Sequence, residues 1–218
     1  MEKGRVLKRI EEIGVIPVVR AATPDAAVSA AEAIRDGGIP ILEITMTVPG
    51  ALEVIAELNQ RFGDEVLVGA GTVLDPDAAR ACIDVGAQFI VSPSLNTQTV
   101  QFCNRQRVAV FPGALSPTEV VTAWQIGADA VKVFPCSAVG GPQYLRALKA
   151  PLPQVKIVPT GGVSLATVRE FIAAGAWALG VGADLVNTTA IKDGKSESVT
   201  AAARSYVTAV REARSLPG

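Results

Sequence analysis

Short apolar runs alternate with longer amphipathic segments along the whole chain. Runs of this kind, bounded by turn residues, are typical of buried strands, whereas the longer segments between them have the spacing of helices with one polar face. The predicted strands are Val15–Val19, Ile41–Thr45, Val66–Ala70, Phe89–Ser92, Ala109–Phe111, Ala130–Phe134, Lys156–Val158 and Ala178–Gly180.

The helical segments carry explicit start and stop signals. Thr23, Asp75 and Ser116 each precede a proline, which places an N-cap residue directly before the first helical position. Glu119 completes a capping box with Ser116. Predicted left-handed helix ends fall at Gly37-Gly38, Gly63, Gly86, Gly127 and Gly175.

Regular strand–helix alternation predicts an α/β protein, and more specifically a single (β/α)8 TIM barrel. Residues 1–218 lie within the length range of one such domain, and no linker or second domain is evident. Lys3–Ile13 is predicted as an extra helix before the first strand, and Ser196–Arg214 as a closing helix.

Composition narrows the class of protein. With 19% charged residues and a net charge of −1, the chain has no basic surface for nucleic acid. No apolar run approaches the roughly 20 residues of a membrane span, and the N-terminus is charged, unlike a signal peptide. Three scattered cysteines argue against a disulfide framework, so we expect a cytoplasmic protein.

Histidine is absent, which excludes imidazole metal sites, Ser-His-Asp triads and Cys-His dyads. No Cys-x-x-Cys pair offers a zinc site either. Proton transfer must therefore use carboxylates, lysine, tyrosine, cysteine or water, and neither a metal nor another cofactor is expected.

Lys132 stands inside the apolar run Ala128–Pro135. Lysine is rarely buried without a reason, and burial disfavours an ammonium ion, which makes a buried lysine a usable amine nucleophile. The alternative is a lysine at a strand end whose charged tip reaches water.

A glycine repeat relates Lys132 to a second candidate. Gly38, Gly86, Gly127 and Gly175 precede alternate strands, and the fifth residue after each is Glu43, Val91, Lys132 and Gly180. Alternate strands of a barrel fill the same interior layer, so Glu43 and Lys132 should meet near the carboxyl ends of their strands. The pair is either catalytic or a structural salt bridge.

Two glycine-rich loops are typical of an anion site. Thr160, Gly161 and Gly162 follow the seventh predicted strand, and Gly182 and Ala183 follow the eighth. Glycine lets backbone N–H groups approach an anion closely, and a short helix beginning near Ala183 would add its dipole. Loops at these positions commonly bind phosphate, although they could be plain turns. The negative charge of Asp184 suits an anion site only if this side chain points away.

At the level of motifs, the chain resembles the bacterial 2-keto-3-deoxy-6-phosphogluconate (KDPG) aldolases, including the bifunctional 4-hydroxy-2-oxoglutarate (KHG) aldolases. The resemblance covers nearly the whole chain. The motifs that carry it are GGIPILEIT at 37–45, VGAGTV at 68–73, FIVSP at 89–93, VKVFP at 131–135 and PTGGV at 159–163.

The resemblance implies site residues. Lys132 matches the Schiff-base lysine and Glu43 the general acid/base; Gly161 and Gly162 match the phosphate loop, and the predicted substrate contacts are Arg20, Thr45, Thr72, Pro93 and Phe134. Two departures concern anion binding. Thr47 stands where many members have arginine, which leaves Arg20 for that role, and Ala183 stands where others have serine.

The family implies a homotrimer with metal-independent class I chemistry that releases pyruvate from a 2-keto acid, with glyceraldehyde 3-phosphate or glyoxylate as the other product.

Two other functions remain open from the residues alone. A sugar-phosphate isomerase or decarboxylase would share the glycine loops, and a non-catalytic barrel would need neither Glu43 nor Lys132.

Overall fold

Parallel strands and surrounding helices make up this α/β protein. The computed structural model describes residues 2–215. Its strands are β1 (Val15–Val19), β2 (Ile41–Thr45), β3 (Leu67–Gly71), β4 (Phe89–Val91), β5 (Ala109–Phe111), β6 (Gly113–Ala114), β7 (Val131–Val133), β8 (Ile157–Pro159) and β9 (Leu179–Val181). Every residue of these strands is buried, so the helices and strands share one apolar core.

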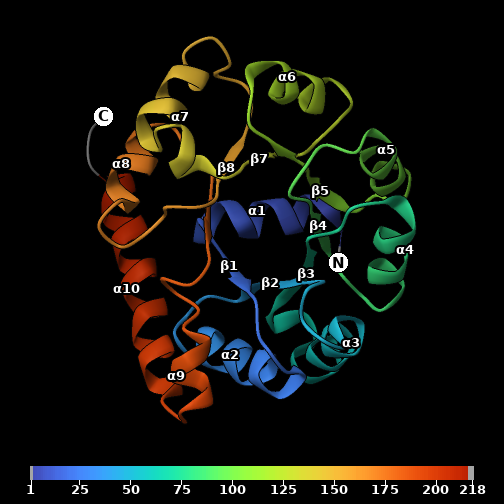
Figure 1. The fold of residues 1–218 in the computed structure, drawn as a ribbon, viewed down its shortest axis with the longest axis vertical. Coiled ribbons are helices and arrows are strands. Elements are labelled where there is room, and N and C mark those ends of the chain that lie inside the picture. The colour runs from blue at the N-terminus through green and yellow to red at the C-terminus, as the bar shows by residue number, and fades with distance from the viewer. Residues whose placement is uncertain (1, 216–218) are drawn as a thin grey trace.

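Helices surround the strands, and α1 (Lys3–Ile13) lies across the middle of the view (Figure 1). The surrounding helices are α2 (Pro24–Asp36), α3 (Ala51–Phe62), α4 (Pro76–Asp84), α5 (Thr97–Arg105), α6 (Pro117–Gln125), α7 (Pro142–Lys149), α8 (Val168–Ala173), α9 (Thr188–Lys192) and α10 (Ser196–Ser215). Two short 3-10 helices, η1 (Gly63–Glu65) and η2 (Cys136–Val139), complete the order.

The strand hydrogen bonds fall into two parallel sheets. One sheet has six strands in the order β5-β4-β3-β2-β1-β9, and the other has three in the order β6-β7-β8. The sequence predicts eight strands in one closed sheet, and in this respect the prediction is not met. Pro112 separates β5 from β6, because proline has no N–H for a ladder hydrogen bond. The sheets adjoin through a parallel bridge between Thr160 and Gly180.

Most of the predicted local signals are confirmed. Thr23, Asp75 and Ser116 each accept a hydrogen bond from a backbone N–H in the first helical turn, and Glu119 closes the capping box. The helix predicted near Ala183 is wrong. Instead, the Gly182 carbonyl accepts the N–H groups of residues 185 and 186 in a turn, and α9 begins later, at Thr188.

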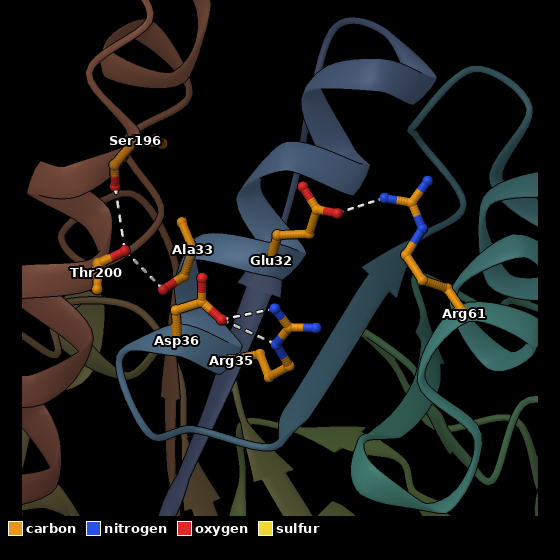
Figure 2. A network of polar contacts seen from close by, with 7 residues as sticks. All are labelled: Glu32, Ala33, Arg35, Asp36, Arg61, Ser196 and Thr200. Atoms are coloured by element: carbon orange, nitrogen blue, oxygen red, sulfur yellow. Dashed lines mark hydrogen bonds and ion pairs between the residues drawn. The ribbon is translucent and has the colours of Figure 1, made fainter.

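Two helices outside the strand–helix repeat close the structure. α1 contacts residues that precede the strands: Arg9 donates to Asp64 O, and Lys3 pairs with Asp129 at 2.9 Å. α10 packs against α2, where Thr200 Oγ1 donates to Ala33 O at 3.0 Å (Figure 2). α1 therefore lies at the amino ends of the strands, and α10 packs beside α2. Neither of these contacts involves the carboxyl ends of the strands.

Candidate active site

The side chains of Lys132 and Glu43 meet in the interior. β7 positions Lys132 and β2 positions Glu43, and each residue is only 2% exposed. Lys132 Nζ lies 3.7 Å from Glu43 Oε1. The burial rules out the alternative in which this lysine reaches water, and the two residues share a level, as the glycine repeat predicts.

A glycine on the neighbouring strand makes room for the carboxylate. β2 and β3 pair in parallel register, with Thr45 opposite Gly71. A Cβ built on Gly71 would lie 2.6 Å from Glu43 Cδ and 2.7 Å from Glu43 Cγ, so any side chain here would displace the glutamate. The glycine at the end of β3 therefore allows Glu43 to point into the interior toward β7.

The amine and carboxylate are close without being fully hydrogen-bonded. Glu43 Oε1 has no hydrogen-bond partner among the described residues, and 3.7 Å is beyond hydrogen-bond range. A buried ion pair stabilises a fold only when its geometry is excellent and its remaining polar atoms are satisfied. This pair meets neither condition. The arrangement leaves an amine and a carboxylate oxygen without hydrogen bonds to each other, on either side of a short gap.

Phe134 connects the buried pair with an open cavity at the carboxyl ends of the strands. Lys132 Nζ lies 5.3 Å from the centre of the Phe134 ring, within cation–π range, and the ring also lines the cavity. The cavity measures about 590 Å³. Seven of the predicted site residues line it: Arg20, Phe134, Thr160, Gly161, Gly162, Gly182 and Ala183.

The glycine loops form one wall of this cavity. Gly161 and Gly162 both have positive φ (90° and 78°), a conformation that favours glycine. Cys136 N donates to Thr160 O at 2.9 Å and so supports the loop from η2. Burial raises the pKa of the Cys136 thiol to about 11, which leaves it a poor nucleophile at neutral pH.

Arg20 is the one arginine among the residues that line the cavity. It is exposed, and among residues 2–215 it forms no ion pair within 4.0 Å. Thr45 holds the backbone at Val19, the residue before Arg20, because the Thr45 hydroxyl donates to Val19 O at 3.2 Å. The same hydroxyl lies 2.7 Å from Thr47 Oγ1. Arg20 is therefore a cation whose guanidinium is available to an anion.

The remaining predicted residues lie outside the cavity lining. Thr45 is fully buried at the end of β2. Thr72 is half-buried just after β3 and has a φ of 60°, a strained conformation for a β-branched residue. Such strain is concentrated at functional sites. Pro93 is half-buried after β4, and its backbone lies close against Gly113.

A tyrosine that is not among the predicted site residues contacts Asp184 in the cavity wall. Tyr206 is fully buried in α10, and its hydroxyl donates to Asp184 Oδ2. The same oxygen accepts the Leu165 N–H at 3.3 Å. Burial, and secondarily the contact with Asp184, raises the pKa of Tyr206 well above its usual range. Because a buried tyrosine hydroxyl needs a hydrogen-bond partner, the presence of Tyr206 in the predicted closing helix was the signal in the sequence for such a contact.

A second cavity, also about 590 Å³, lies between α2 and α10. Two of its acidic residues pair with arginines: Glu32 with Arg61, and Asp36 with Arg35 at 2.7 Å (Figure 2). It contains no buried nucleophile. Between residues 2 and 215 we find no cluster of three or more residues suited to a metal ion, and no helix long and apolar enough to cross a membrane.

The chain is similar in sequence to known aldolases. The family model for KDPG and KHG aldolase matches residues 6–202. The 2-dehydro-3-deoxy-6-phosphogalactonate aldolase of Escherichia coli (strain K12) is 36% identical, over 93% of this chain and 97% of that protein. The 2-dehydro-3-deoxy-phosphogluconate aldolase of Treponema pallidum (strain Nichols) is 39% identical, over 77% of this chain and 80% of that protein.

Among solved structures, KDPG aldolase from Legionella pneumophila superimposes with a TM-score of 0.85 at 30% identity. The match covers 94% of this chain and 97% of that chain. In that structure pyruvate is captured as a covalent carbinolamine intermediate. Such an intermediate requires an amine nucleophile in the neighbour's site.

Proposed function

We propose a class I aldolase activity for this chain, which belongs to the KDPG and KHG aldolase family. The substrate is a 2-keto acid with a hydroxyl at C4, either KDPG or KHG. The single observation that carries the assignment of residues is the buried pair, Lys132 Nζ 3.7 Å from Glu43 Oε1. An amine beside an unsatisfied carboxylate is what Schiff-base cleavage requires.

The chemistry follows from these two groups. The neutral amine of Lys132 adds to the C2 ketone to give a carbinolamine, which loses water to an iminium ion. Glu43, directly or through a water, removes the proton of the C4 hydroxyl. The C3–C4 bond then breaks, its electron pair enters the iminium as an enamine, and the aldehyde leaves. Protonation at C3 and hydrolysis release pyruvate and restore the lysine.

The proximity of Glu43 also offers an acceptor for the proton that Lys132 must lose before it adds to the ketone. A proton passing from the Lys132 ammonium to the carboxylate converts an ion pair into a neutral amine and a carboxylic acid. The acid can then assist loss of water from the carbinolamine. General acid–base help of this kind is worth about 10²–10⁴ in rate.

We assign the two ends of the substrate to different parts of the site. Thr72, Pro93 and Phe134 surround the pyruvyl end, with Thr45 supporting them from beneath. The far end, phosphate or carboxylate, lies against Arg20 and the loop wall formed by Thr160, Gly161, Gly162, Gly182 and Ala183. What supports this division is the position of Phe134, which touches both Lys132 and the cavity.

A second substrate deserves equal testing. The E. coli relative that covers 93% of this chain acts, by its name, on 2-dehydro-3-deoxy-6-phosphogalactonate. That compound differs from KDPG in the configuration at C4, the carbon whose hydroxyl Glu43 deprotonates. The chain is therefore proposed to accept one or both C4 epimers.

The loop wall offers a clean variant for the phosphate assignment. Gly162 is unsuitable, because its φ is positive and an added Cβ would lie 2.5 Å from Ser137 Cβ. At Gly182 an added Cβ meets nothing within 4 Å, so Gly182→Ala places a methyl group in the open cavity. This variant should weaken use of KDPG more than use of KHG, which has no phosphate.

The architecture, assembly and location of the chain belong to the same proposal. We propose that the two sheets act as one (β/α)8 barrel within a single domain, which the bridge between Thr160 and Gly180 supports. A homotrimer is proposed from the family, and light scattering tests it. A cytoplasmic location is proposed from the free, buried Cys82, Cys103 and Cys136.

The direct experiment is pyruvate release, followed by coupling to lactate dehydrogenase. KDPG, its C4 epimer and KHG are each supplied to the purified protein without added metal. Release of pyruvate from at least one of them supports the proposal. No release from any of the three would overturn it.

A further inference from the structure

The carboxylate of Asp184 joins three separate parts of the chain. Asp184 lies in the loop after β9, Leu165 in the loop after β8, and Tyr206 in α10. Asp184 Oδ2 accepts both the Tyr206 hydroxyl and the Leu165 N–H, the latter at 3.3 Å. The loops after β8 and β9 therefore share one hydrogen-bond acceptor. A side chain of α10 donates to the same acceptor.

The helix is a firm point of attachment. Tyr206 is fully buried, so its ring cannot move without disturbing the core. α10 is also fixed near its C-terminal end, where Arg214 donates to Trp177 O at 2.9 Å and to Glu11 O at 2.6 Å. By contrast, both loop residues are exposed. Asp184 thus connects α10 with exposed positions in both loops, which the buried Val163 and Leu185 anchor elsewhere along their length.

This contact also accounts for an acidic residue beside an anion site. Asp184 lines the same cavity as Arg20 and the glycine loops, where a free carboxylate would repel an anion. Hydrogen bonds from Tyr206 and Leu165 both end on Oδ2, which holds that oxygen toward α10 and the neighbouring loop. Charge-assisted hydrogen bonds to a carboxylate are stronger than neutral ones.

We propose that Asp184 and Tyr206 are positioning residues for the anionic end of the substrate. They hold the loops after β8 and β9 at the separation at which backbone N–H groups of both loops reach one anion. Neither side chain contacts the reacting atoms. The inference rests on the proposed aldolase function and adds to it a device that should affect the phosphorylated substrate selectively.

Three variants test this clamp, by which we mean the hydrogen bonds from Tyr206 and Leu165 to Asp184. Tyr206→Phe removes only the hydroxyl, and Asp184→Ala removes the acceptor, whereas Asp184→Asn keeps an oxygen that can accept both hydrogen bonds. For KDPG, Tyr206→Phe and Asp184→Ala should raise KM about 3–10-fold with kcat nearly unchanged, the size of one lost hydrogen bond. For KHG, KM should change less than 2-fold, and Asp184→Asn should restore KM for KDPG to near its original value.

A double variant and a matched control complete the design. Because the Tyr206 hydroxyl acts only through Asp184, Tyr206→Phe combined with Asp184→Ala should raise KM no further than Asp184→Ala alone. Tyr144→Phe is the control, since Tyr144 also donates its hydroxyl to an acceptor, Leu115 O, away from the cavity. It should leave the ratio of the two KM values unchanged.

The outcomes separate this inference from the proposed function. Equal KM increases for KDPG and KHG, a loss confined to kcat, or a lower KM for KDPG in Asp184→Ala would each overturn the clamp while the wild-type protein remains an aldolase. A wild-type protein that releases pyruvate from no substrate overturns the proposed function itself. The wild-type measurement alone distinguishes the two failures.

Discussion

Glu43 occupies space that only a glycine at position 71 leaves open. A Cβ on Gly71 would lie 2.6 Å from Glu43 Cδ, and the whole end of the glutamate side chain would have to move. Because Lys132 Nζ lies 3.7 Å from that carboxylate, the neighbouring strand helps to set the distance between the amine and the carboxylate. The site thus depends on a residue with no functional group.

Gly71→Ala should therefore impair cleavage of the substrate more than imine formation. The added methyl displaces the Glu43 carboxylate but leaves Lys132 in place, so kcat should fall about 10–100-fold while imine formation with pyruvate persists. Steady-state kinetics and imine trapping measure the two effects. Gly4→Ala in α1 is a matched control, because its Cβ meets nothing within 4 Å; it should leave both unchanged.

Glu43→Gln keeps the size of the side chain but removes the base. Turnover should drop roughly 10²-fold or more, because the C4 hydroxyl proton has no acceptor. Trapping of pyruvate should continue, more slowly, since Lys132 is intact. Unchanged turnover would show that another group, or water alone, accepts the proton.

Arg20→Ala should weaken substrate binding rather than chemistry. The guanidinium lines the cavity without an ion pair among the described residues, so an anionic substrate gains a charge-assisted contact there. We expect kcat/KM to fall about 10²-fold, mostly through KM. Arg105→Ala at the end of α5, outside the cavity, serves as the control. A kcat effect alone would contradict the assignment.

Tyr206 predicts a change of stability at alkaline pH. Its pKa is raised in the folded protein, mainly by burial, whereas in the unfolded chain it ionises near pH 10. Above about pH 10 the unfolded state therefore loses a proton that the folded state keeps, and the free energy of unfolding falls as pH rises. Tyr206→Phe should show a shallower decline of Tm from pH 9 upward. An identical decline would argue against the raised pKa.

The fold was largely predictable where local signals act. Thr23, Asp75 and Ser116 cap helices because their side chains bond to backbone a few residues away, a relationship that is visible in sequence. Ala183 was misread because a glycine loop can end in a turn as easily as in a helix. Pro112 is a local signal for the break between β5 and β6, but which sheet each strand joins depends on long-range pairing, which local patterns do not specify.

The candidate site was predictable in part. The regular glycine spacing predicted that Glu43 and Lys132 lie at one level, because alternate strands of a barrel repeat their geometry. The contact of Asp184 with Tyr206 was not predictable, since 22 residues and a change of element separate them. The need for glycine at position 71 was equally hidden, because it arises from the side chain on the neighbouring strand.

Lys149 and Lys156 are excluded as the nucleophile on structural grounds. Lys149 Nζ donates to Pro153 O and Val155 O, both at 2.8 Å, and Lys156 pairs with Glu11 at 3.4 Å. Neither lysine lines the cavity. Replacing Lys132 by Ala should therefore abolish turnover and leave the fold intact, because it removes a buried amine whose desolvation is costly.

Borohydride reduction in the presence of pyruvate, followed by peptide mass analysis, tests this assignment most directly. The account predicts one reduced pyruvyl unit per chain, on the peptide that contains Lys132, and no incorporation in Lys132→Ala. Label on Lys149 or Lys156, or incorporation that survives in Lys132→Ala, would contradict it.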